Sequence, residues 1–324
     1  MLHRMKHHDD IERATLWLAN TCRFLHTLKQ YSGEKQFQTE NTQRQNEHCL
    51  RNFDLSEYRQ VFSDLAVWIY QTLIKNMEAT IQPSIVLIFC WISPPVPAVL
   101  EHEAIAGLTG RRLRGRRFSR AQDTPEYSLD SLMKYMNLVL GVLTQHAVDP
   151  EVIKQIFRQV YYFLGASALN NLLLRKDMRN SSKGMQIRYN LSHMEQWLRD
   201  NKLQESGAGS SLEPIIQASQ LLQARKTDAD VDNVCEMCSN LTVTQIVKIL
   251  KLYTPVDVFE EPVPISYIRK IEQKLKERES IDNSLLMDLK YSYSVTFTFN
   301  ASSIALETIK VPQQLNIAKL VVRC

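Results

Sequence analysis

Residues 169–200, LNNLLLRKDMRNSSKGMQIRYNLSHMEQWLRD, hold the sharpest transition in this sequence. An apolar-rich run ends at Leu174 and meets the charged triplet Arg175, Lys176 and Asp177. A polar turn follows, and a second helical pattern with aromatic side chains continues to the end of the stretch. The stretch contains no acid–base pair and no cluster of metal ligands. A buried helix that passes directly into a charged, aromatic surface is typical of a protein that docks onto other proteins.

The composition favours a helical protein with a substantial core. The chain has 324 residues, of which 44% are hydrophobic and 23% charged, values that are ordinary for a globular protein. Its nine glycines are few for a doubly wound α/β fold or a β-sandwich, whereas Leu, Gln, Lys and Met favour helix. We therefore expect an all-α fold, long enough for two domains.

Charge, cysteine usage and hydropathy narrow the class further. The net charge of +4 is mild and the basic residues are mostly dispersed, so general nucleic-acid binding is not expected. Six scattered cysteines without a secretory signal indicate reduced thiols and a cytoplasmic location. No run of 18 or more apolar residues occurs, so we expect no membrane span.

Apolar residues recur at helical spacing along most of the chain. The clearest stripe runs from Tyr58 to Met77 in steps of three and four residues, and we expect Pro83 to end or kink this helix. Asp149 and Pro150 form a strong helix start, with an N-cap acceptor followed by proline at the first position. The expected helices span 10–31, 54–83, 127–147, 150–177, 186–200, 211–226, 228–239, 242–252 and 263–278.

Two segments are expected to be non-helical. Residues 33–46 are polar and predict a loop. Residues 291–300, YSYSVTFTFN, alternate with period two as a strand does. Because one strand cannot form a sheet alone, we expect these residues to pack as an extended strip on helices.

Three motifs suggest chemistry, and each has a simpler structural interpretation. ESGAGSS at 205–211 lacks the first glycine and the lysine of a phosphate-binding loop, which predicts an interhelical loop. The pair Cys235 and Cys238 has no second pair to complete a zinc site, which predicts two small buried residues on a helix. Residues 101–103, Glu-His-Glu, lack a partner pattern. We therefore predict no catalytic, cofactor-binding or metal-binding residue.

Residues 111–120, RRLRGRRFSR, contain six arginines and predict a self-repelling, mobile loop. Ser119 follows arginines at positions 116 and 117, which suits a basophilic kinase. Phosphorylation there would add about −2 charge beside the arginine cluster. The alternative is a solvated basic loop that touches an acidic partner or anionic lipid.

The stretch at 169–200 resembles the globular tail of class V myosins, the cargo-binding dilute domain. The resemblance covers about residues 9–312. It is also carried by WLANTCRFLHTLKQYSG (17–33), QNEHCLRNFDLSEYRQVFSDLA (45–66), LEPIIQASQLLQ (212–223), TQIVKILKLYTPVDVFEE (244–261), and LLMDLKYSYSVTFTFNASS and ALETIKVP within 285–312.

The resemblance implies a fold and a role. The fold is two stacked helical-bundle subdomains similar to subunits of vesicle-tethering complexes, with an extended C-terminal strip; the expected subdomains are 9–125 and 126–324. The role is non-catalytic and needs no cofactor. Such a tail links an actin motor to vesicles and organelles through Rab GTPases and adaptor proteins, reaches membranes only indirectly, and folds back on the motor head to inhibit it.

Four residues take roles from the resemblance. Tyr189 and Gln223 match positions on a Rab-contacting surface, and Lys176 and Lys248 match positions that contact the motor head. From the residues alone, the two lysines are equally consistent with solvated surface, and Tyr189 and Gln223 with helix packing. Both partners would dock on one small subdomain, which predicts that their binding is coupled.

The sequence departs from the family in three places. The chain is expected to begin inside the domain, without the motor, the neck and the dimerising coiled coil, so apolar surface would be exposed in its N-terminal half. Residues 87–98, LIFCWISPPVPA, have no counterpart in the family. We consider either a gene-model or splicing artefact or a variant adaptor-binding loop. The turn at 179–184, RNSSKG, and the final residues also differ, which leaves the position of the terminal strip open.

Two other functions stay open at this point. A tethering-complex-like scaffold subunit without motor linkage would use the same stacked helices. An enzyme of unrecognised type remains the least supported, since no residue is nominated as a nucleophile.

Overall fold

The computed structural model describes residues 2–90, 128–256, 260–276 and 283–301. Within these ranges it contains helices and turns but no strand, which confirms the all-α prediction. The helices are α1 (Leu2–Gln30), α2 (Lys35–Gln38), α3 (Gln43–Glu47), α4 (Ser56–Cys90), α5 (Leu129–Gln145), α6 (Pro150–Leu174), α7 (Ser181–Asp200), α8 (Glu213–Gln223), α9 (Val231–Met237), α10 (Val243–Lys251) and α11 (Ile265–Lys276). Single 3₁₀ turns are η1 (Lys176–Met178), η2 (Gln204–Ser206), η3 (Ser210–Leu212) and η4 (Asp228–Asp230).

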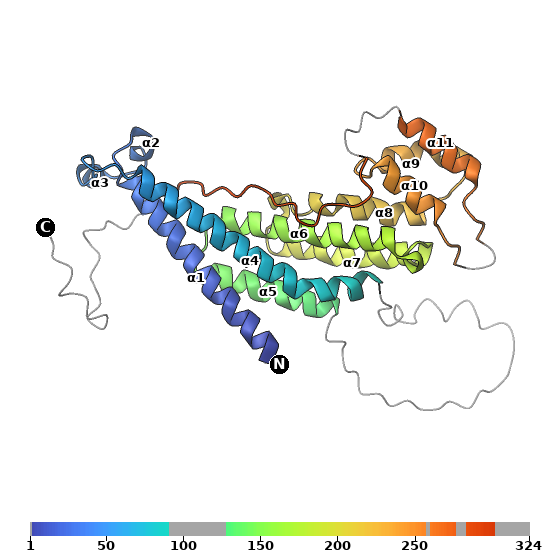
Figure 1. Ribbon diagram of the computed structural model, residues 1–324, viewed down its shortest axis with the longest axis horizontal. Helices are drawn as coiled ribbons and strands as arrows, with labels where there is room; N and C mark the ends of the chain where they lie inside the picture. Colours follow the sequence, from blue (N-terminus) through green and yellow to red (C-terminus); the bar gives the residue numbers. More distant parts are fainter. Residues whose placement is uncertain (1, 91–127, 257–259, 277–282, 302–324) are drawn as a thin grey trace.

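The molecule is elongated, with α6 at its centre (Figure 1). Helices α1 and α4 form an antiparallel pair at one end, and α5 packs against both. Helices α7 and α8 pack on α6, and α9, α10 and α11 form the other end. One continuous apolar core runs from Ile11 to Leu275 through all of the larger helices. The predicted subdomain boundary at 125/126 falls outside the described residues.

Helix α6 has the start that its sequence predicts. The Asp149 carboxylate accepts a hydrogen bond from the Glu151 amide, and Pro150 occupies the first turn. Most of the helix is buried, as its continuous apolar pattern requires. The predicted end near Asp177 is wrong: the helix stops at Leu174 because Arg175 adopts extended backbone, and η1 follows.

Helix α4 passes through Pro83 and ends at Cys90, so of the two predicted effects of this proline, an end or a kink, the end is wrong. Proline removes one backbone hydrogen bond and costs about 3 kcal/mol in a helix interior. Beyond the proline, Ile85 and Ile88 are buried in the core, and the Ile88 carbonyl accepts a 2.7 Å hydrogen bond from the Asn190 amide. These contacts hold the helix together. Residues 87–90 of the segment 87–98 therefore belong to α4, whereas residues 91–98 lie outside the described chain.

The segment at 33–46 is not wholly irregular. It contains the short helices α2 and α3, and Thr42 forms a capping box with Gln45 at the start of α3. Both helices were predicted as loop because each is too short to show a periodic apolar pattern.

The α1–α4 end exposes large apolar side chains. Trp17 on α1 is 62% exposed and Trp68 on α4 is 63% exposed, and Phe24, Tyr58 and Val61 are also exposed. This is the surface that the sequence predicts for the N-terminal half.

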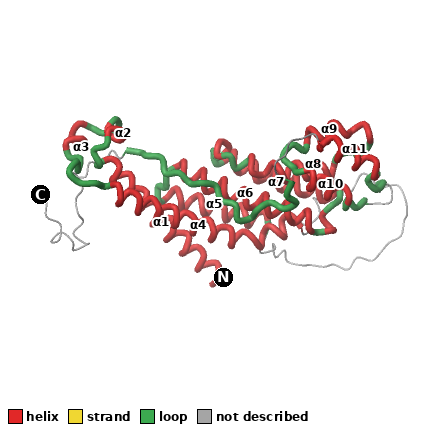
Figure 2. The backbone as a smooth tube through the Cα atoms, turned by 45° about the horizontal axis from the view of Figure 1, so that its top comes forward, coloured by secondary structure: helices red, strands yellow, loops and turns green. Residues whose placement is uncertain are grey.

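Residues 283–300 form an extended strip that runs along the helical body (Figure 1, Figure 2). The strip lies antiparallel to α6 and is held by amide side chains of that helix. Asn170 Nδ2 donates to the Met287 carbonyl and Asn170 Oδ1 accepts from the Met287 amide, both at 2.9 Å. Gln159 pairs in the same way with Tyr291 and Tyr293, and Gln155 with Thr296. The prediction that 291–300 pack as a strip on helices is therefore confirmed.

Candidate binding surfaces

The junction at 174–180 is organised by one buried arginine. The Arg179 side chain is only 2% exposed. Its Nη1 donates to the Leu172 and Leu173 carbonyls at 3.3 and 2.9 Å, and its Nε donates to the Leu252 carbonyl at 3.3 Å. Burial lowers the pKa of the guanidinium, yet arginine stays protonated in proteins. Arg179 thus satisfies the free carbonyls at the end of α6 and joins them to the end of α10.

The charged triplet next to Arg179 lies at the surface. Lys176 and Asp177 in η1 are exposed. The Arg175 guanidinium donates two hydrogen bonds to the Asp177 carboxylate, at 3.2 and 2.9 Å, and this pairing lowers the pKa of Asp177. The bond neutralises two of the three charges, so Lys176 carries the net positive charge of η1.

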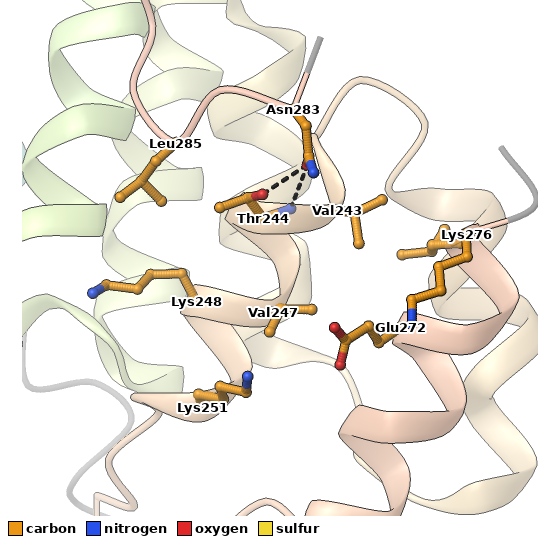
Figure 3. Close-up of a pocket in the computed structure, with 10 residues that line it drawn as sticks. Val243, Thr244, Val247, Lys248, Lys251, Glu272, Lys276, Asn283 and Leu285 are labelled. Carbon is orange, nitrogen blue, oxygen red and sulfur yellow. Dashed lines mark hydrogen bonds between the residues drawn. The ribbon is translucent and has the colours of Figure 1, made fainter. Parts of the chain in front are cut away.

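Lys248 lies on α10, the helix that Arg179 ties to η1. The inward face of α10 is buried through Ile246, Ile249 and Leu250, whereas Lys248 is half-buried. Its aliphatic chain passes beside Leu285 and its amino group points away from α11 (Figure 3). The structure therefore places the two predicted head-contacting lysines on adjoining elements.

Tyr189 and Gln223 lie on α7 and α8, which pack side by side. Tyr189 is 60% exposed and its ring stands edge-on to His193, with centroids 4.6 Å apart. Gln223 is exposed at the end of α8. The helices approach closely at Gly184, where an added Cβ would meet the Ser219 carbonyl oxygen at 2.8 Å and Gln223 Cγ at 3.1 Å. The two predicted Rab-contacting residues are thus both exposed, on two helices that pack against each other.

The remaining sequence motifs have plain structural roles. Cys235 and Cys238 are buried, as expected, in and directly after α9. Residues 205–211 form the predicted interhelical loop between α7 and α8. Ser119, the arginine-rich residues 111–120 and residues 101–103 lie outside the described chain, so their predictions stay untested.

Two negative findings apply to the described residues alone. Over those ranges no three His, Cys, Asp or Glu side chains gather as metal ligands do. None of the described helices has the length and apolar content to cross a membrane.

Sequence reasoning missed Arg179 and the α6 amides that hold the strip. Gln159 and Asn170 are 2% and 8% exposed. A signal was present, because both amides fall within a long helical pattern that is apolar over most of its length. Buried amides require hydrogen-bond partners, but their spacing does not say which segment supplies them.

Comparison with known proteins agrees with this geometry. The model of the DIL domain family matches residues 155–257, which span most of α6 through α10. Human unconventional myosin-Va is 53% identical over 315 residues, covering 96% of this chain but only 16% of that protein. The chain therefore spans about a sixth of the length of this relative.

Solved structures show the same fold. A structure described as the myosin V cargo binding domain superposes with a TM-score of 0.66 at 20% identity, covering 93% of this chain and 72% of that one. The Myo2 globular tail in complex with Mmr1 superposes with a TM-score of 0.67 at 19% identity, covering 96% and 74%.

The fold is that of an all-helical domain built around a DIL domain. The chain belongs to the family of class V myosin globular tails.

Proposed function

We propose that this domain is the cargo-binding element of a class V myosin, and that it binds Rab GTPases and adaptor proteins. The observation that carries the proposal is the exposure of Tyr189 and Gln223 on α7 and α8, two helices that pack against each other. Aromatic side chains supply much of the binding energy at protein interfaces. A related tail structure contains the bound protein Mmr1, which supports adaptor binding by this fold. The proposed location is the actin cytoskeleton and the surface of vesicles.

We expect Tyr189→Ala combined with Gln223→Ala to weaken binding of a GTP-loaded Rab by about tenfold or more. The loss arises because an exposed aromatic ring and an exposed amide are both removed from the proposed contact surface. Titration calorimetry of the domain against a panel of Rab proteins, each loaded with GTP and with GDP, gives the measurement.

Tyr58→Ala is the matched control, since Tyr58 is also 60% exposed but lies on α4. Equal, negligible binding of every Rab in both nucleotide states would refute the Rab part of the proposal.

The domain is also proposed to contact a myosin motor head through Lys176 and Lys248. Both lysines lie on elements joined by Arg179, and among the described residues neither has a charged partner within salt-bridge distance. Exposed lysines of this kind bind acidic surfaces with an affinity that falls as salt rises.

Lys176→Glu with Lys248→Glu is expected to weaken binding to a class V motor head by about tenfold at low ionic strength. Inhibition of the actin-activated ATPase of an isolated head, titrated with the tail domain, measures this. Lys35→Glu with Lys134→Glu is the control, since both of these lysines are exposed on distant helices. Inhibition that does not change with the first pair of substitutions argues against the head contact.

A further inference from the structure

A pocket of about 580 Å³ opens between α10, α11 and the start of the strip (Figure 3). Its apolar walls come from all three elements: Val243 and Val247 on α10, Leu275 on α11, and Leu285 on the strip. A volume of this size falls in the range of ligand-binding clefts, and it exceeds what one large apolar side chain fills.

The strip wall of this pocket is held in place by hydrogen bonds. Asn283 Oδ1 accepts from Thr244 Oγ1 at 2.7 Å and from the Thr244 amide at 3.3 Å. The Leu285 carbonyl accepts from Gln245 Nε2 at 3.1 Å. Because these bonds fix Leu285 before any ligand arrives, little ordering is needed on binding.

The rim of the pocket is positively charged. Lys248, Lys251 and Lys276 line it beside a single acid, Glu272, whose carboxylate points from α11 towards α10 (Figure 3). Two other lysines of α11 differ, because Lys270 and Lys274 form ion pairs with Asp228 and Asp232. Within the described chain no such ion pair neutralises the three rim lysines.

We propose that this pocket binds a short acidic peptide segment of a protein partner, with one bulky aliphatic or aromatic side chain inserted between α10 and α11. The apolar walls accept the side chain, and the excess of lysines attracts the flanking carboxylates. This inference goes beyond the head and Rab contacts proposed above. It concerns the pocket between α10 and α11, and it shares with the proposed head contact only Lys248, one of the three rim lysines.

The test uses a fluorescein-labelled peptide, Asp-Glu-Glu-Leu-Phe-Glu-Asp, titrated with the domain by fluorescence anisotropy. Two matched peptides carry serine in place of Leu and Phe, or lysine in place of every acid. The assay contains neither a Rab nor a motor head, so its result is independent of the proposed function.

We expect Lys251→Glu with Lys276→Glu to weaken binding of the acidic peptide by about tenfold or more, and both altered peptides to lose binding by a similar factor. Both lysines are exposed, so an unchanged thermal midpoint verifies that the variant folds. The control pair, Lys35→Glu with Lys134→Glu, should bind the acidic peptide as the wild type does.

Three results would overturn the proposal. The first is no anisotropy change with the domain at about 1 mM, the weak limit of specific binding. The second is an equal loss of peptide affinity in the Lys251/Lys276 variant and in the Lys35/Lys134 control variant. That result would mean that binding depends on the net charge of the domain and not on the pocket. The third is undiminished binding of the serine peptide, which means that the apolar walls are not used.

Discussion

Arg179→Met is expected to lower the free energy of unfolding by about 3–5 kcal/mol. The guanidinium donates to the carbonyls of Leu172, Leu173 and Leu252 in a site that is nearly closed to water. Methionine is apolar and has no donor, so these carbonyls would lose their partner where water cannot replace it. Each unsatisfied buried polar group costs about 1–3 kcal/mol. Urea denaturation followed by circular dichroism gives the measurement.

Arg175→Met is the matched control, because this arginine lies four positions earlier and pairs with the exposed Asp177. Exposed ion pairs contribute about 0–1 kcal/mol, so the control should unfold nearly as the wild type does. Equal midpoints for the two variants would mean that Arg179 does not anchor the junction. Arg179→Met should also weaken inhibition of the motor head by the domain, since η1 and α10 would no longer be held together.

Gln159→Leu combined with Asn170→Leu is expected to release the strip from α6. Each amide supplies one donor and one acceptor to the strip backbone, at Tyr291 and Tyr293 and at Met287 respectively. At about 1 kcal/mol for each net hydrogen bond, loss of the four bonds amounts to about 4 kcal/mol. Hydrogen exchange at 287–293 should accelerate by about a hundredfold or more, as read by mass spectrometry.

Gln196→Leu serves as the control, because that amide bonds only to neighbouring side chains on the exposed surface of α7. Hydrogen exchange of the strip in this control variant should match that of the wild type. If the double variant protects the strip as well as the wild type does, the aromatic contacts of Tyr162 with Tyr291 and Tyr293 hold the strip instead.

Local signals in the sequence were sufficient for most of the helices. The Asp149–Pro150 start lies where the sequence predicts it, and the helix expected over 242–252 begins after a capping box at Thr242. The errors occur where long-range contacts override local preference. Pro83 predicts a break, but buried Ile85 and Ile88 and the bond from Asn190 hold α4 together beyond it.

The candidate surfaces were only partly accessible to sequence reasoning. Exposure of Lys176 follows from the charged triplet, but its position beside α10 depends on Arg179, whose partners lie as far as 73 positions away. The strip was expected to be extended from its alternation, yet the amides that hold it are 117 to 141 positions distant in sequence. The pocket is formed by three segments whose proximity no local pattern encodes.

The amide pairs along α6 also set how the domain bears mechanical load. The strip follows α6 from Asn170 to Gln155 and continues to Lys29, which donates to the Phe297 carbonyl. A pulling force along the strip loads its hydrogen bonds together, in shear, whereas a force across it peels them apart one after another. The domain is therefore mechanically anisotropic. The same strip resists tension parallel to α6 and yields to tension perpendicular to it.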